Sequence, residues 1–199
     1  MSDWDYNRKA NFLWTTNNED REDNDFYATD PNSLKIFLDR IDEDNIHIGP
    51  TIWECACGTG VLSEVLKERG YKVASSDIID RGYPNTHIVD FLNVGETFTF
   101  DGDVLTNPPY KYALDFIKQA LSVVEDGNKV IMYLKIQFLE GKERKKFYKD
   151  NPPKYIYVFS ERQTCYRNGD FSEKKGSTVC YCWYIWEKGY KGDPIIRWL

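Results

Sequence analysis

A short turn, Asn107-Pro108-Pro109-Tyr110, combines residue types that can hold a flat amino group. It follows the apolar pair Val104-Leu105 and precedes a helical pattern, so we expect it at the carboxyl end of a strand, where open α/β sheets bind ligands. Proline has no N–H to donate and keeps the preceding residue extended, so the turn is stiff and rich in carbonyl acceptors. An ordinary loop is the alternative, because Asn-Pro and Pro-Pro are common turn markers.

A second turn, Cys55-Ala56-Cys57-Gly58-Thr59-Gly60, lies between a predicted strand and a predicted helix. Its small residues let the backbone approach a nucleoside, and Asp77, at the end of the next predicted strand, can accept both ribose hydroxyls. The turn departs from the dinucleotide fingerprint because Ser63 stands at the third glycine position, and because Glu54 would repel a pyrophosphate. A carboxylate there suits a cationic ligand with ammonium and sulfonium groups. The alternative is a purely structural turn.

The elements that must position these turns alternate between strands and helices, which predicts an α/β fold with a doubly wound, mostly parallel sheet. The last two strands have no helix between them, so we expect them to pair as an antiparallel C-terminal hairpin. The seven predicted strands cover residues 51–54, 71–77, 87–92, 104–106, 129–135, 155–159 and 179–186. Helices are predicted after Asp30, from residue 61, over 112–125 and over 140–149.

Length and composition predict one globular domain over residues 26–199, preceded by an acidic arm at 1–25. No apolar run could span a bilayer, and the polar amino terminus is no secretory signal. We therefore expect a cytoplasmic protein that makes no use of a membrane. No cysteine pair has zinc spacing, so reduced thiols and no metal site are expected.

Charge is distributed unevenly along the chain. The net charge is −6, yet residues 135–175 hold eleven Lys or Arg against six Asp or Glu. The overall acidity argues against broad binding to a polyanion and leaves room for a local basic face. A solvated helix face explains the basic residues at 142–149 nearly as well.

Together the two motifs resemble those of S-adenosylmethionine-dependent methyltransferases. Residues 54–60 resemble the cofactor motif of that family, and residues 107–110 resemble the catalytic motif of the amino-methyltransferases that act on adenine N6 or cytosine N4. Over residues 24–187 the chain is similar to small phage-encoded adenine DNA methyltransferases, and this resemblance implies no separate target-recognition domain of the kind that larger family members carry. The resemblance implies a Rossmann-like class I fold, S-adenosylmethionine as cofactor, DNA as partner and, for a phage protein, the cytoplasm of the host.

The resemblance also implies which residues contact the cofactor. Glu54 would recognise the methionine ammonium through water, and Asp77 would hold the ribose, with Ile78 against the adenine ring. Phe26 and Tyr27 could instead pack on the helix that begins after Asp30. The other implied contacts are Ala56, Cys57, Gly58 and Gly60 in the turn, the pair Asp90 and Phe91, and the upstream Phe26, Tyr27 and Thr29.

The predicted mechanism follows from the electronics of an exocyclic amine, whose lone pair is delocalised into its ring. The Asn107 oxygen and the Pro108 carbonyl would each accept one amine hydrogen and aim the lone pair at the methyl group, giving an in-line displacement. Tyr110 would stack on the base, and Pro109 completes the stiff turn. No Ser–His or Cys–His pair is required.

A base inside a duplex is out of reach, so it must be flipped out or presented in a single strand. We expect a second ring on its other face, Phe171 or, as runner-up, Phe138, although either ring could pack in the core. The basic residues expected to meet phosphates are Lys142, Arg144, Arg162 and Arg167.

Three alternatives share these motifs. The same Asn-Pro-Pro-Tyr turn can grip the NH2 of adenine in RNA or of a glutamine in a protein. A catalytically silent binding subunit with the same fold is an alternative of another class. The intact turn, together with Glu54 and Asp77, speaks against the silent subunit.

Overall fold

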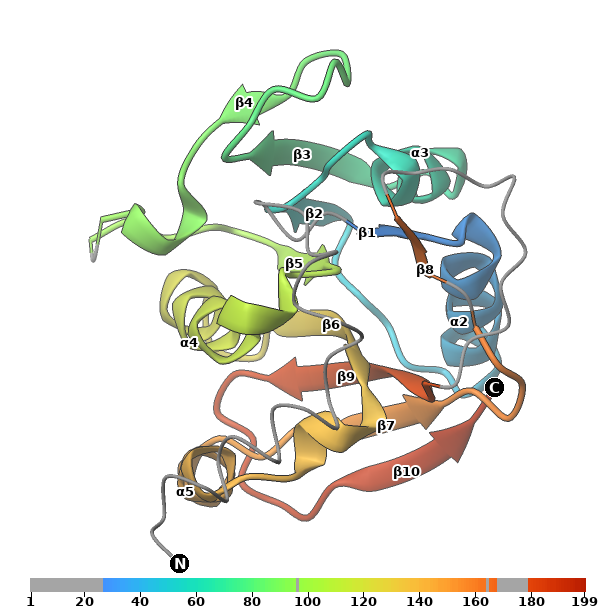
Figure 1. Ribbon diagram of the computed structural model, residues 1–199. Coiled ribbons are helices and arrows are strands. Elements are labelled where there is room, and N and C mark those ends of the chain that lie inside the picture. Colours follow the sequence, from blue (N-terminus) through green and yellow to red (C-terminus); the bar gives the residue numbers. More distant parts are fainter. Residues whose placement is uncertain (1–26, 96, 164, 168–178) are drawn as a thin grey trace, which may run out of the picture.

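The described residues form a central eight-stranded sheet with helices on both faces (Figure 1). The computed structural model describes residues 27–95, 97–163, 165–167 and 179–199. The strands of this sheet are β2 (Thr51–Glu54), β3 (Lys72–Asp77), β4 (His87–Ile88), β5 (Asp103–Thr106), β6 (Lys129–Lys135), β7 (Tyr155–Val158), β9 (Tyr181–Glu187) and β10 (Ile195–Trp198). Their order is β10-β7-β9-β6-β5-β2-β3-β4.

The sheet is parallel from β4 to β6, and β9 runs antiparallel between β6 and β7. The predicted doubly wound fold and its antiparallel C-terminal pair are therefore confirmed. The predicted number of seven strands is wrong, because β10 adds an eighth strand parallel to β7. Strand β10 is short and largely exposed, so it lacks the buried apolar pattern by which the other strands were predicted.

The predicted strand at 87–92 is also shorter than expected. It pairs with β3 only over His87 and Ile88. The chain then enters a 3-10 turn at Phe91–Asn93, because the Asp90 carboxylate accepts the Leu92 N–H at 3.1 Å. A side-chain cap of this kind ends the strand by turning the backbone.

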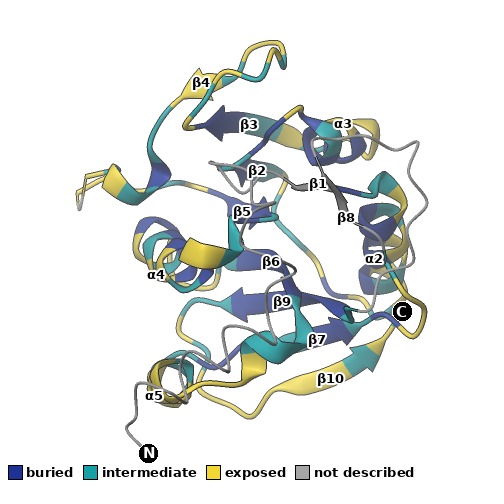
Figure 2. Cartoon of the chain, in the orientation of Figure 1, coloured by how far each residue is buried: buried dark blue, intermediate teal, exposed yellow. Residues whose placement is uncertain are grey.

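Among the described residues, four α-helices cover the two faces of the sheet. Helices α2 (Pro31–Glu43) and α3 (Val61–Glu68) lie on one face, and α4 (Ala113–Val123) and α5 (Lys142–Asp150) lie on the other. Along β5, Leu105 packs in the core on the α2 side and Val104 in the core on the α4 side. The central strands are thus buried on both faces, as Figure 2 shows. Within the described ranges, no helix is both long and apolar enough to cross a bilayer.

A second, two-stranded sheet joins distant parts of the chain. Strand β1 (Tyr27–Thr29) pairs antiparallel with β8 (Cys165–Arg167), with Thr29 opposite Cys165. Strand β1 immediately precedes α2, and β8 belongs to the connection between β7 and β9. This pairing was not predicted, because three-residue strands so far apart in sequence leave no local pattern.

Helix α2 is fixed to the sheet by Trp183 of β9. The Trp183 ring is fully buried and stacks on Phe37, with ring centroids 5.0 Å apart. Its indole N–H also donates to the Ser33 carbonyl in the first turn of α2, at 3.2 Å. The helix start is therefore held by packing and by a hydrogen bond.

We expect Trp183→Ala to lower the free energy of unfolding by about 3–5 kcal/mol, as truncation of a buried aromatic ring does. The matched control is Trp198→Ala, because Trp198 is 65% exposed, and its effect should stay within about 0.5 kcal/mol. Urea denaturation measures both values. Equal losses in the two variants would contradict the packing described here.

Candidate active site

The two turns meet at the carboxyl edge of the sheet. Strands β2 and β5 are parallel neighbours, with Ile52 opposite Asp103 and Trp53 opposite Val104. The glycine-rich turn follows β2 and the Asn-Pro-Pro-Tyr turn follows β5, so they leave the sheet side by side. Strand β3 ends beside β2 with Asp77. This edge is where open parallel sheets hold their ligands.

The Asn107 side chain is fixed by Thr29. Its Nδ2 donates to the Thr29 hydroxyl at 2.9 Å, and Thr29 is only 3% exposed. The Pro109 carbonyl accepts the Tyr112 N–H at 2.9 Å, which closes the 3-10 turn Tyr110–Tyr112 before α4. The carbonyl of Pro109 thus stabilises the turn itself.

The Tyr110 ring has a cation and a second aromatic ring close to it. The Lys135 ammonium is 4.8 Å from its centroid, and the Tyr181 ring lies 6.3 Å away at an angle of 32°. Tyr181 stacks in turn on buried Tyr133, with centroids 5.0 Å apart. Neither Lys135 nor Tyr181 was predicted as part of the site. Alternation along β6 places Lys135 on the same face as Tyr133, and this sequence signal could have indicated Lys135.

Asp77 ties the glycine-rich turn to the end of β3. Its carboxylate accepts the Gly58 N–H at 2.8 Å and the Ile79 N–H at 3.1 Å. A carboxylate has about four acceptor positions, so two bonds leave capacity for ligand hydroxyls. The structure thus brings the predicted residues Gly58 and Asp77 together.

Tyr83, in the connection between β3 and β4, packs on Gly60 and was not predicted. A Cβ at residue 60 would overlap the Tyr83 ring, and Gly60 has a φ of +80°. The Tyr83 hydroxyl donates to Glu64 at 2.5 Å and accepts from Lys67 at 2.7 Å, both on α3. Glycine is therefore required here by the backbone and by the ring. The only sequence signal was one aromatic residue within a polar loop.

Glu54 is buried and joined to α3. It is 1% exposed and accepts a hydrogen bond from the Ser63 hydroxyl, which lies 2.7 Å from the Ser75 hydroxyl. Burial raises the pKa of Glu54 to about 8, more than the Ser63 hydrogen bond lowers it. Ser63, at the position where dinucleotide sites have glycine, is thus the partner of the acid. A nearby cation would stabilise the carboxylate and lower this pKa.

The residues predicted to lie against the adenine ring of the cofactor differ in exposure. Ile78 is 58% exposed, so its side chain is accessible to a ring. Asp90 caps the 3-10 turn and also accepts from the Asn93 amide at 2.6 Å. Phe91 is 2% exposed, with its ring edge-on to Trp53 at 5.0 Å. The Phe91 ring faces the core, so a contact with a ligand would have to come from its backbone.

The remaining residues predicted to contact the cofactor are Ala56 and Cys57 in the glycine-rich turn, and Phe26 and Tyr27 upstream of it. Ala56 is half-buried and Cys57 is buried, with its N–H donating to the Ser76 carbonyl at 2.9 Å. Tyr27 lies in β1, but its side chain lies outside the described part, and Phe26 lies outside the described residues.

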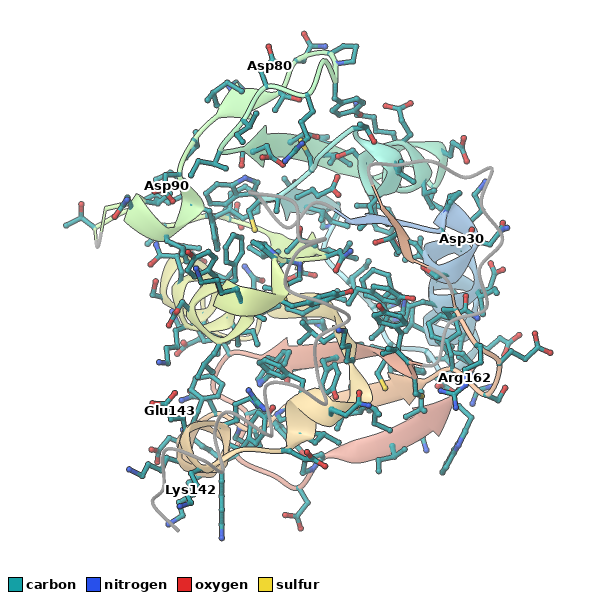
Figure 3. All side chains as sticks on the ribbon, in the orientation of Figure 1. Asp30, Asp80, Asp90, Lys142, Glu143 and Arg162 are labelled. Atoms are coloured by element: carbon teal, nitrogen blue, oxygen red, sulfur yellow. The ribbon has the colours of Figure 1, made fainter. Side chains whose placement is uncertain are left out.

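The predicted substrate contacts whose side chains are described do not form one patch. Figure 3 shows Lys142 on α5, well apart from Arg162. Arg144 covers the Phe138 ring, with its guanidinium carbon 4.9 Å from the centroid, and Phe138 also contacts Tyr184 edge-on. Phe138 thus has partners on α5 and β9. Arg167 lies in β8 with its side chain outside the description, and Phe171 lies outside the described residues.

The raised pKa of Glu54 predicts a pH-dependent stability. Between its ordinary pKa of 4.5 and about 8, the folded state holds a proton that the unfolded state has lost. Stability should therefore fall as pH rises through this window, by at most about 1.4 kcal/mol per unit. Glu54→Gln, which stays neutral, should flatten the profile. The control is Glu68→Gln, because Glu68 is exposed, and its profile should match that of wild type. Urea denaturation at several pH values measures the three profiles. Identical profiles for Glu54→Gln and wild type would contradict the raised pKa of Glu54.

Gly60→Ala should destabilise the protein for two separable reasons. The left-handed backbone costs about 1–2 kcal/mol with a Cβ, and overlap with the Tyr83 ring adds about 1–3 kcal/mol. In a Tyr83→Ala background only the first cost remains. A double-mutant cycle by denaturation measures the difference. The same cost in both backgrounds would show that the ring does not restrict Gly60.

The comparisons with known proteins identify the fold. No protein-family model and no curated protein matches the sequence. A Pyrococcus horikoshii protein provisionally described as an RNA methyltransferase is 16% identical, with a TM-score of 0.60 over 92% of this chain and 97% of that one. A Listeria monocytogenes protein provisionally described as a class I S-adenosylmethionine-dependent methyltransferase is 14% identical, with a TM-score of 0.61 over 96% and 72%.

A third similar structure is described as the modification subunit of a provisionally assigned type I restriction enzyme from Vibrio vulnificus. It is 13% identical, with a TM-score of 0.55 over 97% of this chain and 50% of that one. Identities this low show the fold alone. The mostly parallel sheet with antiparallel C-terminal strands is the Rossmann-like fold of the class I methyltransferases.

Proposed function

We propose that this protein transfers a methyl group from S-adenosylmethionine to the exocyclic N6 amine of adenine in DNA. The observation that carries the proposal is the placement of the Asn107 turn beside the glycine-rich turn, at the ends of the parallel strands β5 and β2. One turn suits an amine and the other suits a nucleoside with cationic groups. Class I methyltransferase structures share this fold.

The residues at the carboxyl edge fit the proposed cofactor. Asp77 has acceptor capacity for the ribose hydroxyls, and exposed Ile78 offers an apolar face to the adenine ring. Buried Glu54 would face the ammonium, and a cation close to it would favour its charged form. When bound, S-adenosylmethionine supplies an electrophilic methyl group on a sulfonium centre.

The turn supplies the positioning chemistry. The Asn107 Oδ1 and the Pro108 carbonyl would accept the two amine hydrogens, since the Pro109 carbonyl already accepts the Tyr112 N–H. The nitrogen lone pair would then be directed at the methyl carbon. Transfer would form a C–N bond as the C–S bond breaks, and the extra proton on nitrogen would pass to water. Fixed acceptors lower the barrier because they need no reorganisation.

Charge around Tyr110 favours an anionic substrate. The Lys135 ammonium over the Tyr110 ring places a cation at the proposed base-stacking position. Nucleic acid carries a phosphate beside each base, and a glutamine side chain does not. The exposed basic residues Lys142, Lys145 and Lys146 of α5 add positive charge on the α4 side of the sheet. This distribution supports nucleic acid over a protein amide.

Methyl transfer from labelled cofactor tests the proposal directly. The acceptors are unmethylated duplex DNA, single-stranded DNA, RNA and a glutamine peptide, with nucleoside mass spectrometry of the products. We expect N6-methyladenine in DNA. Asn107→Ala should lower kcat/KM about 100-fold or more, as loss of one preorganised polar contact does.

The matched control is Asn128→Ala, in the turn before β6 at the opposite edge of the sheet, which should keep wild-type rates. Methyl on RNA or glutamine alone would contradict DNA as the substrate. Cofactor binding without transfer to any acceptor would support a silent binding subunit. An unchanged rate in Asn107→Ala would contradict the mechanism.

A further inference from the structure

We infer that Thr29 is a positioning residue, whose hydroxyl sets the direction in which the Asn107 amide presents its oxygen. The inference rests on the proposed function, because it concerns the same amine-binding turn. Thr29 and Asn107 lie 78 residues apart in sequence, yet the Asn107 Nδ2 donates to the Thr29 Oγ1 at 2.9 Å.

Direction matters because an asparagine amide has one donor end and one acceptor end of nearly the same shape. With Nδ2 bound to Thr29, Oδ1 is at the other end of the amide and can accept from an amine. A rotated amide would present N–H to the N–H of the substrate, which removes one acceptor and adds a repulsion. The hydroxyl of Thr29 therefore selects the amide rotamer that the proposed chemistry needs.

Thr29 itself is held by strand pairing and by the helix that follows it. Within the small sheet it pairs with Cys165 of β8. The next residue, Asp30, caps α2, because its carboxylate accepts the Asn32 N–H at 2.9 Å and its carbonyl accepts the Ser33 hydroxyl at 2.8 Å. The first turn of α2 is in turn fixed to the core by the Trp183 indole N–H.

The Thr29 side chain has little freedom of its own. It is 3% exposed, and a β-branched side chain has few allowed χ1 rotamers. An acceptor with so little freedom, on an anchored segment, can fix a neighbouring amide. The small β1–β8 sheet thereby links the connection between β7 and β9 to the proposed catalytic turn.

This role differs measurably from the cofactor contact that resemblance implied for Thr29. A cofactor contact would change the dissociation constant of S-adenosylmethionine. A positioning residue would lower kcat at saturating cofactor and leave that constant unchanged.

The test compares Thr29→Val, which keeps the shape and removes the hydroxyl, with Thr29→Ser, which keeps the hydroxyl. Three quantities are measured: kcat on unmethylated DNA, cofactor affinity by calorimetry, and the side-chain amide resonance of Asn107 with its proton exchange. Thr29→Val should lower kcat about 10–100-fold, the scale expected for a misplaced catalytic group. It should also shift the amide resonance, speed its exchange and leave cofactor affinity unchanged.

Thr29→Ser should resemble wild type in all three measurements, and Thr29→Val should add no further loss in an Asn107→Ala background. Thr29→Ala provides a second variant without the hydroxyl if the valine variant does not fold. Weaker cofactor binding with an unchanged kcat would overturn the inference, as would a full additional loss in the Asn107→Ala background.

The amide resonance separates this inference from the proposed function. If wild type transfers no methyl group, the proposed function fails and the resonance alone decides the role of Thr29. An Asn107 amide with the same shift and exchange in Thr29→Val as in wild type would overturn the positioning role.

Discussion

The register of the three central strands depends on one buried carboxylate, that of Asp103. It is 1% exposed and accepts the Gly49 N–H at 2.6 Å and the Lys129 N–H at 2.7 Å. These groups lie ahead of β2 and at the start of β6, on either side of β5. Asp103 thus aligns β2, β5 and β6 at their amino ends, and the aligned strands deliver both turns to the same carboxyl edge.

Packing enforces the same alignment along the strands. Ile52 and Leu105 lie in the core on the α2 side, whereas Trp53 and Val104 lie in the core on the α4 side. A slip of one residue would exchange these faces, and both are buried. The positions of the glycine-rich turn and the Asn107 turn relative to each other therefore follow from core packing far from any ligand.

Polar groups at the carboxyl edge are buried or half-buried and form hydrogen-bonded pairs. Glu54 accepts from Ser63, Asp77 accepts from Gly58, and Asn107 donates to Thr29. Burying such groups is costly unless they are hydrogen-bonded, so each pair helps to define one arrangement of the site. Each pair also joins two different elements, which couples the shape of the site to the fold.

The sequence was sufficient for features that repeat along one segment. Apolar runs predicted the strands from β2 to β9 in the main sheet, and the helical spacing of apolar residues predicted the helices α2 to α4, because burial imposes these patterns locally. Helix α5 was predicted as an exposed helix from its many Lys and Arg residues. Features made by contact between distant segments left no such pattern. The β1–β8 sheet, the Tyr83 ring on Gly60 and the bond from Asn107 to Thr29 all belong to this class.

Motif matching had a related limit at Phe91. The motif indicated an aromatic residue after Asp90, but neighbouring Trp53 and Phe116 determine that its ring is buried. Strand β10 was missed because an exposed edge strand carries no buried apolar run. Residue types thus indicated the chemistry of the site, and tertiary contacts decided which atoms face it.

A crystal structure of the protein with S-adenosylhomocysteine would show whether the cofactor meets the Asn107 turn at the carboxyl edge of the sheet. We expect the ribose hydroxyls on the Asp77 carboxylate and the sulfur on the side of the Asn107 amide, whose Nδ2 still contacts Thr29. A ligand bound elsewhere, or bound with its sulfur directed away from Asn107, would contradict this expectation.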